Sequence, residues 1–222
     1  MKQAFFLTGT DTEIGKTFIT CALLHHAQSR GLRAAGIKPV AAGTDAAGRN
    51  DDVENIRAAS NVVLTEDILN PYCFQSAGAP HLAAAEEGRS IEFARIKAAC
   101  AQAREQSEFL IVEGVGGFRV PLGVDGDSAD LAVALALPVI LVVGLRLGCI
   151  NHALLSVEAI QARGLQLAGW VANCIDPQMH KQDENLNTLR QLISAPLLGC
   201  VPFTAEGGPA AAAPHLHGAT TL

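Results

Sequence analysis

The fold of this chain is most constrained by residues 9–17, which read Gly-Thr-Asp-Thr-Glu-Ile-Gly-Lys-Thr. The apolar run 4–7 before them is typical of a buried strand, and residues 16–29 after them show helical spacing of apolar side chains. A glycine-bounded loop between strand and helix is the setting of a phosphate-binding loop, where backbone N–H groups and the helix dipole converge on an anion. Lys16 would then contact the β- and γ-phosphates, and the Thr17 hydroxyl would bind Mg²⁺.

The spacing of this loop departs from the usual pattern. Gly9 and Gly15 enclose five residues, whereas the common motif has four. A strand–helix turn that happens to contain Gly-Lys-Thr is therefore the alternative interpretation. We favour phosphate binding because strand, loop and helix follow one another in the order that the mechanism requires.

Six short apolar runs alternate with helical segments along the chain. Several are apolar at consecutive positions, which is typical of strands covered on both faces in a parallel sheet. The expected strands are 4–7, 34–37, 109–112, 139–143, 167–172 and 197–201, and the expected helices are 16–29, 51–59, 80–87, 91–106, 128–136, 150–163 and 181–194. We predict an α/β fold of the P-loop NTPase type: one domain over residues 1–206, with a parallel sheet between helices, and a poorly ordered or loosely docked Gly/Ala/Pro-rich tail over 207–222.

Open parallel sheets bind ligands outside the carboxyl ends of their strands, so polar residues at those ends are site candidates. Lys38 closes the second run and would meet an anion, unless it merely extends to the surface. Glu113 closes the third run before a glycine-rich turn with Gly116, and could bind Mg²⁺. Asp51 and Asp52 fit either a helix cap or a metal ligand equally well.

The fourth and fifth runs end in weaker candidates. Residues 148–151 form the start of a helix and could bind a carboxylate, although an ordinary capping turn is the better interpretation from these residues alone. Asn173 carries a donor and an acceptor that suit a nucleobase edge, or it caps its own turn.

Composition excludes several classes of protein. The net charge is −6 and no block of Lys and Arg occurs, which argues against nucleic-acid binding. The longest apolar run, 131–147, is interrupted by Pro138 and Gly144 and does not fit a membrane span. We expect no leader before the first strand, and the six cysteines form no Cys-x-x-Cys pair. We expect six free thiols and a cytoplasmic location.

Several motifs together resemble the dethiobiotin synthetase family over nearly the whole chain up to about residue 203. They are the loop at 9–17 with its extra residue, Lys-Pro-Val at 38–40, Asn-Pro-Tyr at 70–72, Pro-His at 80–81, Val-Glu-Gly-Val-Gly-Gly at 112–117, Gly-Cys-Ile-Asn-His-Ala at 148–153 and Gly-Trp-Val-Ala-Asn at 169–173. The first motif alone fits a wider group that includes partition ATPases and cobyrinate-type amidases.

The resemblance implies an ATP- and Mg²⁺-dependent ligase of biotin biosynthesis. Its substrates would be 7,8-diaminopelargonic acid and CO₂ or bicarbonate, joined through a carbamate and a carbamic–phosphoric mixed anhydride. It also implies a homodimer with the active site at the interface, and no nucleic-acid or membrane partner.

The same resemblance assigns roles to residues. Catalysis would involve Thr12, Lys16 and Lys38, and the metal ligands would be Thr17, Asp52 and Glu113. Nucleotide contacts would come from Glu13, Ile14, Gly15, Lys16, Thr17, Gly116, Asn173, Pro202 and Phe203. The metal ligands Asp52 and Glu113 would also contribute to nucleotide binding. Substrate contacts would come from Thr12, Lys38, Ala42, Gly148, Cys149, Ile150 and Asn151, the last four across the dimer interface.

The chain departs from the family pattern at Ala42, where some relatives have a hydroxyl residue, at Cys174, where an acidic residue can occur, and after Glu206. Two other functions remain open. A partner-switching ATPase of the partition type would need a basic surface or a membrane-targeting helix, and the sequence offers neither. A glutamine-dependent amidase would need a further domain with its own nucleophilic cysteine.

Overall fold

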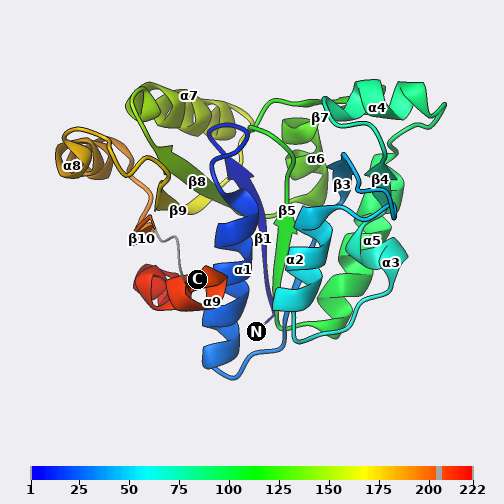
Figure 1. The fold of residues 1–222 in the computed structure, drawn as a ribbon, viewed down its shortest axis with the longest axis horizontal. Coiled ribbons are helices and arrows are strands. Elements are labelled where there is room, and N and C mark those ends of the chain that lie inside the picture. The colour runs from blue at the N-terminus through cyan, green and yellow to red at the C-terminus, as the bar shows by residue number, and fades with distance from the viewer. Residues whose placement is uncertain (1, 204–206, 222) are drawn as a thin grey trace.

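A six-stranded parallel sheet forms the centre of the molecule in the computed structural model, which describes residues 2–203 and 207–221 (Figure 1). The strand order is β10-β9-β8-β1-β5-β2, so the strand before the phosphate-binding loop lies in the middle. All six predicted strands are confirmed. They are β1 (Gln3–Gly9), β2 (Ala34–Ile37), β5 (Phe109–Glu113), β8 (Val139–Leu145), β9 (Leu167–Cys174) and β10 (Leu197–Val201).

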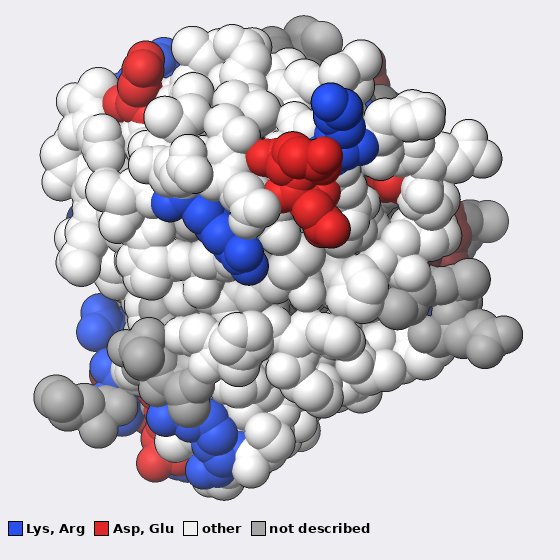
Figure 2. Space-filling view, turned by 90° about the vertical axis from the view of Figure 1, so that its left-hand side faces the viewer, with Lys and Arg blue, Asp and Glu red and all other residues white. Residues whose placement is uncertain are grey.

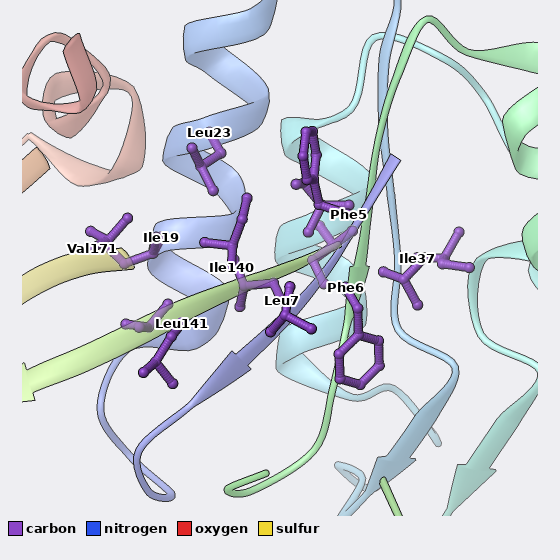
Figure 3. Packing of buried hydrophobic residues seen from close by; sticks show 14 of the residues in the cluster. Phe5, Phe6, Leu7, Ile19, Leu23, Ile37, Ile140, Leu141 and Val171 are labelled. Atoms are coloured by element: carbon purple, nitrogen blue, oxygen red, sulfur yellow. The ribbon is translucent and has the colours of Figure 1, made fainter. Parts of the chain in front are cut away.

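The central strands are apolar on both faces because helices cover both. Ile19 and Leu23 of the first helix point toward the sheet, and Ile140 of β8 points toward that helix (Figure 3). Phe6 of β1 lies on the opposite side, and all four side chains are buried. Burial on two sides explains why these runs carry consecutive apolar residues instead of alternating ones.

The helices form two layers. The first layer, α1 (Lys16–Ser29) and α2 (Asp51–Ala59), packs together on one face, where both contact β2. Right-handed crossovers between the remaining strands place their helices on the other face. These are α5 (Phe93–Gln106), α6 (Ser128–Leu135), α7 (Cys149–Ala162) and α8 (Gln182–Leu192). With α4 (Pro80–Glu86), all seven predicted helices are confirmed to within two residues at either end.

Short elements that the sequence analysis did not predict build the wall beside the loop. Strand β3 (Val40–Ala42) pairs in parallel with β4 (Tyr72–Phe74), after the short helix α3 (Glu66–Leu69). The buried Asn70 side chain donates to the carbonyl oxygens of Lys38 and Tyr72 and holds the two strands together. A second small pair joins β6 (Pro121–Gly123) to β7 (Gly126–Asp127). Runs of two or three residues carry too little periodicity to be recognised.

The expectation of a poorly ordered or loosely docked tail is wrong for residues 207–221. They form α9 (Gly208–Ala212) and the 3₁₀ segment η1 (Ala213–Thr221), which pack against α1 and β10. Leu216 is fully buried, and a Cβ on Gly199 would lie only 2.1 Å from the His215 carbonyl oxygen. Small residues therefore allow close backbone packing here, where composition suggested disorder. Residues 204–206 and 222 lie outside the described residues.

Charged side chains are scattered over the face near α8 and the C-terminal segment (Figure 2). Figure 2 shows Lys and Arg side chains in separate groups on this face, several of them next to Asp or Glu. They do not merge into one basic patch there. Within residues 2–203 and 207–221, no helix combines the length and apolar character needed to cross a bilayer.

Candidate active site

Two glycines of the loop between β1 and α1 lie where the structure leaves no room for a side chain. Gly15 precedes α1 with φ of 81°, and a Cβ on it would lie 2.3 Å from Nδ2 of Asn173. A Cβ on Gly9 would lie 2.8 Å from Cδ1 of Ile14. Glu13 is also left-handed, with φ of 57°. Left-handed residues in such a loop turn backbone N–H groups inward and form an anion-binding nest at the start of α1.

Lys16 is folded back onto this loop. Its Nζ donates to the Asp11 carbonyl oxygen at 2.7 Å, and the side chain is almost entirely buried. Burial, together with the nearby positive charge of Lys38, lowers the pKa of Lys16 to about 8. A polyphosphate in the nest would offer this ammonium group a stronger partner than a neutral carbonyl oxygen.

Glu113 is the centre of a buried polar cluster behind the loop. Its carboxylate has an exposed fraction of 0% and accepts hydrogen bonds from the Thr17 hydroxyl at 2.7 Å and the Thr20 hydroxyl at 2.5 Å. Nζ of Lys38 lies 2.6 Å from Oε1 of Glu113 and 2.8 Å from Oδ2 of Asp52. Two neighbouring strands, β2 and β5, and two helices, α1 and α2, thus bring two carboxylates, two hydroxyls and one ammonium group together.

The charges in this cluster stabilise one another. Burial by itself would lower the pKa of Lys38, but Glu113 and Asp52 outweigh it and raise that pKa above its ordinary value. Burial opposes ionisation of Asp52 too, yet the charge and hydrogen bond of Lys38 hold the pKa of this carboxyl below its usual range. Lys38 and Asp52 are therefore both charged at neutral pH, and the Lys38 ammonium group contacts two carboxyl groups.

A cavity of about 830 Å³ lies in front of the cluster. This volume is in the range of small-molecule sites. Among the residues proposed from sequence, the cavity is lined by Thr12, Glu13, Gly15, Lys16, Thr17, Lys38, Ala42, Asp52 and Gly116. Asp52 faces it, whereas Asp51 is exposed, so the structure separates two carboxylates that the sequence left equivalent.

Other proposed residues lie around the cavity without lining it. Glu113 is buried behind Thr17 and Lys38. The Ile14 side chain is packed in the core, while its carbonyl oxygen accepts a hydrogen bond of 2.8 Å from Nδ2 of Asn173. Pro202 and Phe203 are exposed after β10, one strand beyond Asn173.

Residues 148–151 form the start of α7, away from the cavity lining. Gly148 has φ of 93° and precedes the helix, and Cys149 is buried under it. Gly148 and Asn151 are exposed. Any substrate contact from these residues would therefore be made at the outer surface of the chain.

The sequence analysis did not identify two residues of this region, Thr20 and Arg146. Thr20 lies three residues after Thr17, which places both hydroxyls on the same face of α1, and this spacing was the available signal. Arg146 at the end of β8 forms an ion pair of 2.5 Å with Asp11 in the loop. The two residues are 135 positions apart, so no local pattern could have linked them.

Solved structures share this fold at low sequence identity. The MinC:MinD cell division protein complex of Aquifex aeolicus matches with a TM-score of 0.59 and 12% identity, over 99% of this chain and 94% of that chain. The cell division ATPase MinD of Pyrococcus furiosus matches with a TM-score of 0.59 and 14% identity, over 100% and 99% of the two chains. At identities this low, the structural match shows that the chain shares the P-loop NTPase fold and shows nothing about its activity.

Sequence relatives are far more similar. Residues 3–210 match a family model described as an AAA domain. The ATP-dependent dethiobiotin synthetase BioD of Aromatoleum aromaticum is 61% identical over 217 residues, which is 96% of each chain. The protein of the same name from Janthinobacterium sp. is 54% identical over 95% of this chain and 92% of its own. Such identity over nearly the full length shows that the chain belongs to the family of ATP-dependent dethiobiotin synthetases, which are ligases of biotin biosynthesis.

Proposed function

We propose that this chain closes the ureido ring of dethiobiotin from 7,8-diaminopelargonic acid, CO₂ and ATP, with release of ADP and phosphate. The observation that supports this reaction is the arrangement of Lys16 and Lys38 at one cavity, with the phosphate nest on one side and the β3–β4 wall on the other. Two ammonium groups suit a reaction in which an anionic carbamate attacks an anionic phosphoryl group.

The reaction would proceed in three steps. CO₂ adds to one amine of the substrate and gives a carbamate. A carbamate oxygen attacks the γ-phosphorus of ATP, so that ADP leaves and a carbamic–phosphoric mixed anhydride forms. The second amine then attacks the carbamate carbon, the ring closes and phosphate leaves. The contribution of the chain is to position the groups and to neutralise charge.

Individual residues fit these steps by position. Lys16 would leave the Asp11 carbonyl oxygen for the phosphates, which Glu13, Ile14, Gly15 and Thr17 surround with backbone N–H groups. Lys38 would contact the carbamate and the transferring phosphoryl group. Thr12, Ala42 and Gly116 line the part of the cavity where the diamine would lie.

Mg²⁺ fits the donors at this site. Asp52, Glu113 and the Thr17 hydroxyl offer the hard oxygen ligands that Mg²⁺ prefers, and the two carboxylates already contact a cation, the ammonium group of Lys38. Bound there, the metal would neutralise charge on the phosphates. Lys38 and the metal would compete for the same carboxylate oxygens.

The adenine would lie near Asn173, Pro202 and Phe203. Nδ2 of Asn173 is committed to the Ile14 carbonyl oxygen, which leaves its Oδ1 as the acceptor for an exocyclic amine. Phe203 is 53% exposed and offers a ring to cover the base.

A homodimer would complete the site. Leu147, directly before the α7 N-terminus, is 92% exposed, and Leu155 on the same helix is largely exposed as well. A second copy could cover these side chains, and the N-terminus of α7 at residues 148–151 could then bind the carboxylate of the substrate held by that copy.

The decisive experiment measures ADP release with MgATP and bicarbonate, with and without 7,8-diaminopelargonic acid, followed by mass analysis of the product. We expect release that depends on the diamine and yields the cyclic urea. Release that ignores the diamine would reject the proposed reaction and favour a partner-switching ATPase.

A further inference from the structure

Two cysteines meet on neighbouring strands at the edge of the sheet. Sγ of Cys174 on β9 and Sγ of Cys200 on β10 are 3.9 Å apart. All six cysteines of the chain lie in its described part, and all are free thiols. The expectation of six free thiols is therefore confirmed, yet these two are already in contact.

The strand register explains why the two thiols meet. Cys200 pairs with Ala172, and Ala172 and Cys174 point to the same face of β9 because side chains alternate along a strand. Cys200 and Cys174 are thus diagonal neighbours on one face of the sheet. The register therefore brings the two side chains close, and their rotamers set the separation of the sulfur atoms.

The edge position of β10 makes covalent closure of this pair feasible. A disulfide requires the sulfur atoms to approach to about 2.05 Å. Strand β10 is hydrogen-bonded to β9 alone within the six-stranded sheet, and the chain leaves the strand at Pro202. The segment η1 also packs closely against β10 at Gly199, so closure requires local changes at Cys174 and Cys200 and not a movement of the whole strand.

The environment makes the two sulfur atoms unequal. The hydrogen bond from Cys174 and the positive charge of Arg190 lower the pKa of Cys200 to about 7, against partial burial. That hydrogen bond and burial raise the pKa of Cys174. Cys200, which is half-buried, is the better nucleophile at neutral pH, and Cys174 is the nearby thiol that can resolve its oxidised form.

We propose that Cys174 and Cys200 are a peroxide-sensitive dithiol that closes to a reversible intramolecular disulfide between β9 and β10. The Cys200 thiolate attacks one oxygen of hydrogen peroxide, the O–O bond breaks, and hydroxide leaves and becomes water by taking up a proton. The sulfur of Cys174 then attacks the resulting sulfenic acid, the S–S bond forms, the S–O bond breaks, and a second water carries away the thiol proton. Two thiols are oxidised and one peroxide is reduced.

The pair formed by Cys174 and Cys200 is separate from the proposed catalytic residues but adjoins the proposed adenine position. Cys174 directly follows Asn173, whose amide is bound to the phosphate-binding loop. The chain after Cys200 leads within three residues to Phe203. The disulfide would therefore covalently join the two strand ends that flank the proposed adenine position.

The test uses the full-length reduced chain, freed of reductant and exposed to hydrogen peroxide. After remaining thiols are blocked, a non-reducing digest is analysed by mass spectrometry, and free thiols are counted in denaturant. We expect a peptide pair linked through Cys174 and Cys200, loss of two of the six thiols, and full recovery with dithiothreitol.

Two variants make the test specific. In Cys174→Ser the linked pair should be absent and Cys200 should proceed to sulfinic acid, since its resolving thiol is gone. Cys73→Ser is the matched control, because Cys73 is also half-buried but burial raises its pKa, and this variant should still lose two thiols. Accumulation of Cys200 sulfinic acid in the wild-type chain without a linked peptide, or a disulfide between two chains, would overturn the proposal.

Discussion

Lys38 and Glu113 form a buried ion pair, with Nζ and Oε1 2.6 Å apart and exposed fractions of 3% and 0%. The same ammonium group reaches Asp52, so one lysine contacts both proposed metal carboxylates. A cation is thus part of this cluster before any ligand binds. The consequences of removing it can be measured without turnover.

Lys38→Met should destabilise the ligand-free protein by about 3–5 kcal/mol, because it leaves two carboxylates without their cation. Mg²⁺ without nucleotide should then raise the melting temperature of the variant more than that of the wild type, since the competitor for the oxygens is gone. Thermal unfolding with and without Mg²⁺ checks this. Lys97→Met, at an exposed position on α5, is the control. Equal Mg²⁺ shifts in all three proteins would contradict the competition.

Glu113→Gln should raise the Mg²⁺ concentration needed for half-maximal diamine-dependent ADP release by at least about tenfold, since a charged ligand becomes neutral. A Mg²⁺ titration at saturating substrates measures the change. Glu158→Gln, an exposed position on α7, should leave the titration unchanged. If Glu113→Gln has the same midpoint as wild type, Glu113 is not a metal ligand.

ATP binding should weaken as the pH rises through about 8. Burial lowers the pKa of Lys16 to about that value in the ligand-free protein. The protonated amine of Lys16 is the form that binds phosphate. Above this pH the amine is mostly neutral in the ligand-free protein, so ATP binding must be accompanied by proton uptake, which weakens it. Calorimetric titration across this range checks the trend. Lys16→Ala should lower turnover by at least about 100-fold and abolish the pH trend. An unchanged trend in the variant would assign it to another group.

Inactive Lys16→Ala and inactive Asn151→Ala chains should complement each other if the site is shared between two subunits. Random mixing yields heterodimers with one intact site, so about a quarter of wild-type activity should return. Mixing Lys16→Ala with Thr17→Ala is the matched control, because both defects affect the same half of the site and no activity should return. Lack of recovery in verified Lys16→Ala/Asn151→Ala heterodimers would place the whole site in one chain.

Leu216→Ala should lower the free energy of unfolding by about 2–5 kcal/mol, because it opens a cavity between η1 and its neighbours. Leu192→Ala, whose side chain is 54% exposed at the end of α8, should change it by less than about 0.5 kcal/mol. Chemical denaturation of both variants measures the difference. Equal small effects would mean that the C-terminal segment contributes little to stability.

The sequence alone determined the framework of this protein. Consecutive apolar residues marked all six strands of the main sheet, because strands buried on both faces need them. The phosphate-binding loop was recognisable because its function requires glycines, a lysine and a hydroxyl residue at fixed places between one strand and one helix. These signals are local, and the motifs 9–17 and 112–117 carried the family resemblance as well.

Tertiary structure decided which residues meet. Lys38 reaches Glu113 because β2 and β5 are neighbours in the sheet, although 75 positions separate them in the chain. Asp52 faces the cavity and Asp51 does not, because successive side chains on a helix point about 100° apart. The contact of Cys174 with Cys200 follows from strand register, and the docking of η1 from close backbone packing at Gly199. Local composition carries no record of strand order or register, since both arise only when the whole sheet assembles.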